Sequence, residues 1–183
     1  MSDVLTVINE RKSVRNYSDQ PVKPEDLKVI AESAIWAPNG MNKQAWHFSV
    51  VSNPELLDRM RKACRKGMAD SNLPFLQERL QNPDYDAFFH APAVIVISIA
   101  EDRLTFFDSG AAAATICLAA KGLGYGSCIT ASTAFMFEGD PEIKSALEIP
   151  DDYHFACAVS IGIEKDGPDD HVRDRNKEVI SYL

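Results

Sequence analysis

The chain has 183 residues, of which 45% are hydrophobic and 25% are charged, and its formal net charge is −8 at pH 7. This length and balance are typical of a soluble globular protein with a full hydrophobic core, so we expect a single domain over residues 1–183. Because nucleic acids and anionic membranes attract basic surfaces, the acidic balance argues against both as partners.

Helical spacing of apolar residues and capping signals predict five helices. They are expected over residues 2–11, 23–38, 53–67, 108–124 and, as a short helix, 140–150. Their predicted starts carry residues that favour helix N-termini: Ser2, Pro24, Asn53 followed by Pro54, and Asp140. Gly67 is expected to end the third helix. The fourth helix is rich in small residues and apolar nearly all round, which indicates burial on most sides.

Four stretches have the composition of strands: residues 46–51, 92–100, 125–130 and 155–163. The first alternates apolar and polar residues, whereas the second, "PAVIVISIA", is a continuous and largely β-branched run. Such a run is typical of a strand that is buried on both faces of its sheet. Four strands among five or more helices predict an α+β layer fold.

The four cysteines are widely scattered and form no CxxC pair: Cys64, Cys117, Cys128 and Cys157. We therefore expect buried free thiols in a reducing compartment rather than disulfides, and the cytoplasm is the expected location. The first residues lack the layout of a signal peptide, and the most apolar stretch is too short to span a membrane.

The stretch "INERKSVRNYS", residues 8–18, concentrates Arg11, Lys12, Ser13 and Arg15 in an acidic chain. Basic residues near the end of a helix can simply complement its negative dipole, and a solvated helix end is one reading. Guanidinium groups beside a serine hydroxyl are also natural ligands for a phosphate. Arg15 favours the second reading, because it lies beyond the predicted helix.

A second polar stretch, "APNGMNKQAWHFSVV", joins a predicted helix to a strand. Turn formation explains Asn39 and Gly40. It explains Asn42 and Gln44 less well, since amides just before a strand could present donors and acceptors to a heteroaromatic ring. The glycine-rich "GLGYGSC" lacks the order and spacing of a dinucleotide-binding fingerprint, and no metal-like cluster is present. If the chain is an enzyme, a cofactor is expected to supply the chemistry.

These two stretches together resemble the N-terminal signature of the FMN-dependent nitroreductase family, and "FFHAPAVIVIS", "DSGAAAATICLAAKGLGYGSC" and "LEIPDDYHFACAVSIG" resemble its later blocks in the right order. The resemblance implies a nitroreductase-like α+β fold, with a central, mostly antiparallel sheet of four to five strands flanked by helices. It also implies an interlocked homodimer with two FMN sites built from both chains.

The resemblance further implies which residues bind the cofactor: Arg11, Lys12, Ser13, Arg15, Asn39, Asn42, Gln44, Ser127, Cys128, and Arg173 or Arg175. The four N-terminal residues would hold the phosphate and ribityl chain, and Lys12 could also stabilise the reduced flavin. The partner subunit would supply the two asparagines, with the glutamine close by. The backbone of the serine–cysteine pair would face the ring, and one late arginine would return to the phosphate.

The activity implied is that of an NAD(P)H oxidoreductase with tightly but non-covalently bound FMN. In a ping-pong reaction NADH or NADPH would give a hydride to the flavin and leave, and a nitroaromatic or quinone would then be reduced. Two alternatives stay open. One is a related reaction, such as reductive dehalogenation, enone reduction or oxygen-dependent flavin breakdown, for which residues 67–90 would form only a short lid. The other is a protein that stores or senses FMN without turnover.

Overall fold

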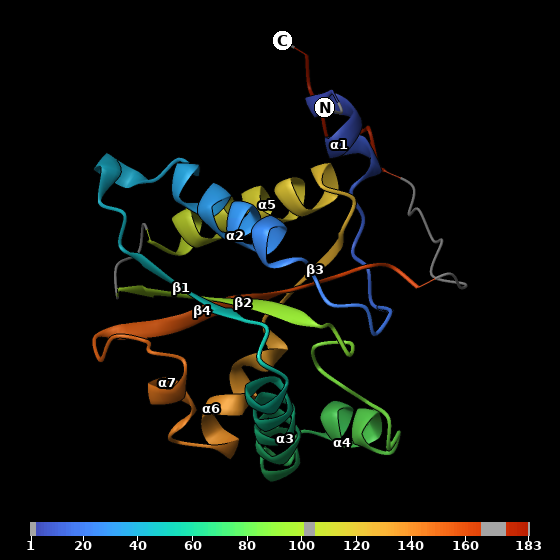
Figure 1. The fold of residues 1–183 in the computed structure, drawn as a ribbon, viewed down its shortest axis with the longest axis vertical. Coiled ribbons are helices and arrows are strands. Elements are labelled where there is room, and N and C mark those ends of the chain that lie inside the picture. Colours follow the sequence, from blue (N-terminus) through green and yellow to red (C-terminus); the bar gives the residue numbers. More distant parts are fainter. Residues whose placement is uncertain (1–2, 101–104, 166–174, 183) are drawn as a thin grey trace.

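The computed structural model describes residues 3–100, 105–165 and 175–182, and it has three layers, with helices on both faces of one sheet (Figure 1). Four strands form the sheet: β1 (Trp46–Val51), β2 (Ala93–Ala100), β3 (Gly126–Thr130) and β4 (Tyr153–Gly162). Their spatial order is β1-β2-β4-β3, and every neighbouring pair is antiparallel. The expectation of an α+β fold with a mostly antiparallel sheet is confirmed.

The central strand β2 explains why its sequence is a continuous apolar run. Ile95 and Ile97 belong to the core on one face of the sheet, whereas Val94 and Val96 belong to the core on the other face. Because successive side chains of a strand point to opposite faces, only a strand covered on both sides needs apolar residues at every position.

Helices α2 (Pro24–Ser33) and α5 (Thr105–Gly122) cover the upper face of the sheet as drawn in Figure 1. The short helix α1 (Val4–Glu10) lies at the edge of this layer. Ala112, Ile116 and Ala120 of α5 are buried, whereas Phe106 and Phe107 are 67% and 77% exposed. Within one chain α5 is therefore buried along one side only, which is less than its composition predicts.

The lower layer consists of α3 (Pro54–Asp70), α4 (Pro74–Leu80), α6 (Phe135–Gly139) and α7 (Ile143–Ala146). Asn53 caps α3 as expected, because its side-chain oxygen accepts a hydrogen bond from the Leu56 amide at 2.9 Å. Residues 67–90, considered above as a short lid, instead contribute Leu76 and Phe88 to the core of this layer.

Two predicted helix boundaries differ from those of the structure, and a third falls on a residue that it does not describe. The helix that was expected to end at Gly67 continues to Asp70. Gly67 is a glycine for another reason: it faces α6, and a Cβ atom there would overlap the carbonyl oxygen of Phe135. The short helix expected over 140–150 covers only α7, and its N-cap is Glu142. Asp140 instead accepts the Glu142 amide in the preceding turn, at 3.0 Å. Ser2, the expected cap of α1, lies outside the described residues.

All four cysteines are buried free thiols, as the sequence predicts. Burial raises the pKa of Cys64 and of Cys157 to about 12, so both thiols stay protonated at neutral pH. Among the described residues no helix is long and apolar enough to cross a membrane, and no cluster of His, Cys, Asp or Glu could hold a metal ion.

Candidate functional site

The N-terminal segment that follows α1 runs beside the edge strand β3 and the end of β4. Ser13 forms a parallel bridge with Ser127, and the Val14 amide donates to the carbonyl oxygen of Ser127 at 3.0 Å. Further along, the Ser18 amide donates to the carbonyl oxygen of Ile163 at 2.9 Å. The cationic stretch is thus fixed to the sheet by its backbone, which leaves its side chains available for other contacts.

Two side chains of this segment are buried. Val14 is 2% exposed, and Tyr17 is buried with its hydroxyl donating to the carbonyl oxygen of Val14 at 2.8 Å. Arg15 and Asn16, which lie between them, are exposed, and Arg11, Lys12 and Ser13 are partly exposed. The cationic side chains are thus accessible to a ligand, and the assignment of Arg11, Ser13 and Arg15 to one site stays a prediction.

A cavity of about 90 Å³ opens between this segment, the end of α5 and the start of β3. It is lined by Glu10, Arg11, Lys12, Val14, Lys121, Gly124, Tyr125, Gly126, Ser127 and Glu164. Two ion pairs frame it: Lys12 Nζ lies 2.7 Å from Glu164 Oε1, and Lys121 Nζ lies 3.1 Å from Glu10 Oε2. The cavity lining thus holds three cations and two carboxylates, so its local charge is positive although the chain has a net charge of −8. A positive local charge favours an anionic ligand.

The positive charge of Arg11 also affects the pKa of the Cys117 thiol in α5. Burial raises the pKa of this thiol, whereas a hydrogen bond with Ser127 and the nearby positive charge of Arg11 act in the opposite direction. Residues far apart in the sequence therefore influence this buried thiol. Cys128, the next residue of β3, is itself 2% exposed.

The second polar stretch forms a tight loop between α2 and β1. The side-chain oxygen of Asn39 accepts the Gln44 amide at 3.0 Å, and the Gly40 amide donates to both carboxylate oxygens of Asp108, at 3.1 and 3.2 Å. Asn42 and Gln44 are exposed and have φ angles of 51° and 49°. Left-handed non-glycine residues are uncommon and cluster at functional sites, so this loop stays a candidate binding element.

Within one chain the two polar stretches are not brought together. Figure 1 places the loop that precedes β1 at one end of the upper layer and the segment that follows α1 at the other. Of the two late arginines, Arg173 lies outside the described residues, and Arg175 is exposed and does not line the cavity. The predicted site residues therefore form two separate groups.

Sequence reasoning missed several residues of this site. Lys121 and Glu164 line the cavity and pair with Glu10 and Lys12, respectively. Phe89 lies outside the cavity, but its ring centre is 5.9 Å from the guanidinium carbon of Arg15. The sequence gives only a weak indication that Lys121 and Glu164 belong to the site: Lys121 is in the last turn of α5, and Glu164 follows β4. The sequence holds no signal for Phe89, because turn geometry alone brings it to Arg15.

The donor set fits the phosphate end of FMN. Arginine forks, a serine hydroxyl and lysine ammonium groups are the groups that bind phosphate in proteins. The cavity itself is smaller than the roughly 300–1,000 Å³ of typical ligand pockets. The chain is thus an α+β protein in which a cationic segment, residues 11–15, is fixed to the edge of an antiparallel sheet.

Comparison with known proteins identifies the family. A model of the nitroreductase family matches residues 8–163, and the chain belongs to this family. A relative from Archaeoglobus fulgidus, whose name pairs NADH dehydrogenase with NAD(P)H nitroreductase, is 31% identical over 181 residues, covering 95% of this chain and 92% of the relative.

Two crystal structures of nitroreductases with bound FMN share the fold. The protein from Bacteroides fragilis is 27% identical, with a TM-score of 0.91 and all of both chains covered. The protein from Desulfitobacterium hafniense is 33% identical, with a TM-score of 0.89, covering 100% of this chain and 99% of that one. The predicted resemblance and the nitroreductase-like fold are thereby confirmed.

Proposed function

We propose that this chain is an FMN-dependent NAD(P)H oxidoreductase that reduces small electron-poor acceptors, such as nitroaromatics and quinones, in a ping-pong reaction. The observation that carries the proposal is the cationic segment of a nitroreductase-family chain, residues 11–15, which is fixed along β3 while Arg15 is exposed and Arg11 and Ser13 are partly exposed. Its arrangement suits the phosphate of a flavin nucleotide better than a solvated helix end, because Ser13 and Val14 are bound to the sheet rather than to α1.

In this proposal the chain binds and orients the cofactor. Arg11 and Arg15 hold the phosphate through charge-assisted hydrogen bonds, Ser13 adds its hydroxyl, and one of the two late arginines completes the shell. Lys12, held by Glu164 at 2.7 Å, keeps a positive charge at the mouth of the cavity. The backbone at Ser127 and Cys128 faces the ring.

FMN, when bound, supplies a ring that takes a hydride from NADH or NADPH and passes electrons to an acceptor. The chain's contribution is electrostatic, because fixed cations near a ring that gains negative charge stabilise that charge. Lys12 is proposed for this role. No side-chain acid or base is required, since water supplies the protons.

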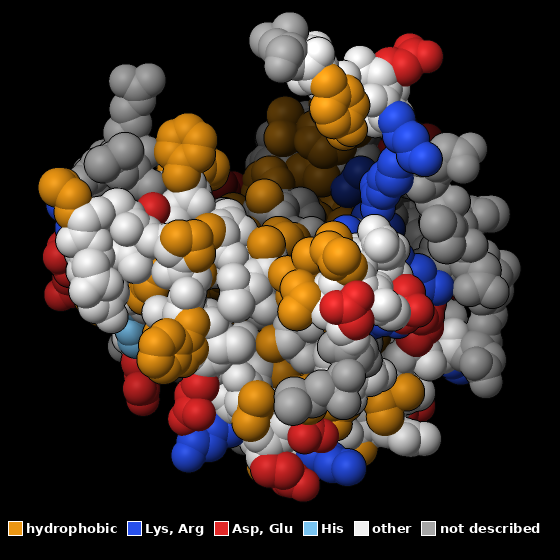
Figure 2. Space-filling view, turned by 90° about the horizontal axis from the view of Figure 1, so that it is seen from above, with side chains coloured by type: hydrophobic (Ala, Val, Ile, Leu, Met, Phe, Trp, Pro, Cys, Tyr) orange, Lys and Arg blue, Asp and Glu red, His pale blue; other side chains and the backbone are white. Residues whose placement is uncertain are grey.

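The proposed site is completed by a second copy of the chain in a homodimer. The loop with Asn39, Asn42 and Gln44 is remote from the cationic segment of its own chain, and the cavity is too small for a whole flavin nucleotide. Large apolar side chains are exposed in the layer that holds both groups, and Figure 2 shows apolar side chains spread across this face. They include Val4, Leu5, Ile35, Trp36, Met41, Phe106 and Phe107. Exposed large apolar side chains on one face support the proposal that a second chain covers this face.

The function is tested by an absorbance spectrum of the purified protein, reconstituted with FMN and then titrated with NADH and with NADPH without oxygen. We expect flavin bands that bleach with at least one nucleotide and return when a nitroaromatic or quinone is added. Flavin bands that persist with both nucleotides would indicate a storage or sensor protein. A protein that binds no FMN would contradict the proposal altogether.

The shared site predicts recovery in a mixed dimer. Two inactive parents are made: R11Q/R15Q removes the phosphate ligands, and N42G removes an amide while keeping a residue suited to the left-handed backbone. A dimer with one copy of each parent has one doubly altered site and one intact site. We expect a mixed dimer, purified through two different tags, to regain about half of the wild-type activity.

The matched controls for this experiment are the two parent homodimers, each carried through the same purification. A site built within one chain would leave the mixed dimer as inactive as its parents. That result would contradict the placement of the Asn42 loop in the partner's site, while the spectrum above would still report whether the protein is a flavin reductase.

A further inference from the structure

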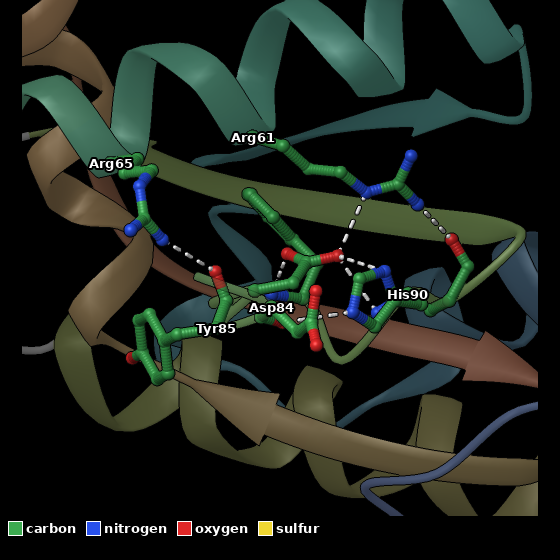
Figure 3. Close-up of polar contacts among 8 residues, drawn as sticks. Arg61, Arg65, Asp84, Tyr85 and His90 are labelled. Atoms are coloured by element: carbon green, nitrogen blue, oxygen red, sulfur yellow. Dashed lines mark hydrogen bonds and ion pairs between the residues drawn. The ribbon is translucent and has the colours of Figure 1, made fainter. Parts of the chain in front are cut away.

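The turn that leads from α4 into β2 is organised by the buried carboxylate of Asp86. Figure 3 shows the polar contacts in this region, with Arg61 and His90 labelled. The Asp86 side chain is 4% exposed. One oxygen accepts the Phe88 amide at 2.8 Å, and the other accepts the His90 amide at 2.8 Å and Nε of Arg61 at 2.9 Å. Arg61 also donates to the carbonyl oxygen of Ala91 at 2.8 Å, so both ends of the turn are attached to α3.

Between these attachments lie two consecutive left-handed residues, Phe89 and His90, with φ angles of 58° and 57°. Bulky residues rarely adopt this conformation, and they persist in it only where the surroundings determine the backbone. The two amides that Asp86 accepts come from Phe88 and His90, one on each side of Phe89. Asp86 thus fixes the direction in which the Phe89 side chain leaves the turn.

Phe89 leaves this turn toward the cationic segment. It packs against the small buried cluster of Val14, Tyr17 and Ala91, and its ring centre lies 5.9 Å from the guanidinium carbon of Arg15. This distance is within the range of a cation–π contact. Arg15 also donates to the carbonyl oxygen of Ser13, at a long 3.4 Å. The ring therefore restricts an arginine that is otherwise exposed.

We propose that Phe89 is a positioning residue of the cofactor site: held by Asp86 in a left-handed turn, it keeps the guanidinium of Arg15 where it can bind the phosphate. The inference rests on the function proposed above, which places Arg15 at the FMN phosphate. A flexible arginine loses conformational freedom when it binds, and a preformed contact reduces that cost. Phe89 acts through Arg15 and is not expected to touch the cofactor.

The test is FMN affinity, measured by flavin fluorescence quenching with apoprotein. F89L keeps apolar bulk but removes the ring, and we expect it to weaken FMN binding about 2–5-fold. F89Y restores a ring and is expected to bind FMN as the wild type does. In an R15Q background, F89L should have no further effect, because the group that it positions is gone.

The chain offers a matched control on α4, where the ring centre of Phe75 lies 6.0 Å from the guanidinium carbon of Arg79. F75L removes a similar contact away from the site and should leave FMN affinity unchanged. Unchanged affinity in F89L, or an equal loss from F89L with and without Arg15, would overturn the inference.

A second readout separates failure of the inference from failure of the proposed function. The same cycle of F89L and R15Q is measured by urea unfolding of the apoprotein, where we expect the two effects to be non-additive. If the wild type binds no FMN, the proposed function fails, and additive effects in this cycle would show that Phe89 does not hold Arg15 either.

Discussion

Asp86→Ala is expected to lower the free energy of unfolding by about 3–5 kcal/mol, because removing one partner of a buried ion pair leaves the rest uncompensated. The variant leaves Arg61 without its carboxylate and leaves the amides of Phe88 and His90 without acceptors. Each unsatisfied buried donor carries a cost of its own. Urea unfolding of the apoprotein measures the difference.

A matched control comes from the same helix that carries Arg61. Asp58 pairs with Lys62 at 2.6 Å, which is shorter than the 2.9 Å of the Asp86 pair, but its side chain is 54% exposed. Asp58→Ala is expected to change stability by no more than about 0.5–1 kcal/mol, because water screens exposed pairs. If Asp86→Ala and Asp58→Ala lowered the free energy of unfolding equally, burial would not determine how much these ion pairs stabilise the protein.

Gly139→Ala is expected to destabilise the protein by about 3 kcal/mol, and Gly67→Ala by a similar amount. The two glycines form the contact between α3 and α6. A Cβ atom on Gly139 would overlap the carbonyl oxygen of Ala63, and one on Gly67 would overlap that of Phe135. Since both obstacles are backbone, the helices would have to separate, and overpacking of this kind typically costs about 1–3 kcal/mol or more.

Gly122, at the end of α5, is the control for these substitutions. A Cβ atom there would meet nothing within 4 Å. Alanine has the higher helix propensity, so Gly122→Ala should leave stability unchanged or raise it by up to about 0.5–1 kcal/mol. Thermal or urea unfolding of the three variants gives the comparison. A Gly139→Ala variant as stable as Gly122→Ala would contradict the close approach of α3 and α6.

The sequence predicts well those helices and strands whose structure is determined by their own local residue pattern. The apolar run of β2 and the Asn53–Pro54 start of α3 are read correctly because burial on two faces and helix capping leave local signatures. The end of α3 is predicted wrongly, since a glycine usually stops a helix. Gly67 instead allows the close approach of α6, and no local pattern near residue 67 indicates contact with a helix that begins at residue 135.

The same contrast holds for the candidate site. Arg11, Ser13 and Arg15 stand out in the sequence because they concentrate positive charge in an acidic chain. Their position beside Ser127 depends on a bridge between residues more than one hundred positions apart. The role of Phe89 depends on a left-handed turn that a buried aspartate imposes, and phenylalanine itself gives no sign of such a backbone.

The order β1-β2-β4-β3 also has a meaning for how the chain is made. The strand synthesised last, β4, is the one that pairs with both β2 and β3, and the sheet cannot close before residue 162 has left the ribosome. Until then the backbone groups along one edge of the very apolar β2 have no partner. Unpaired apolar edges promote aggregation, and long-range pairing slows folding. The nascent chain therefore carries an aggregation hazard that the finished protein buries at the centre of its sheet.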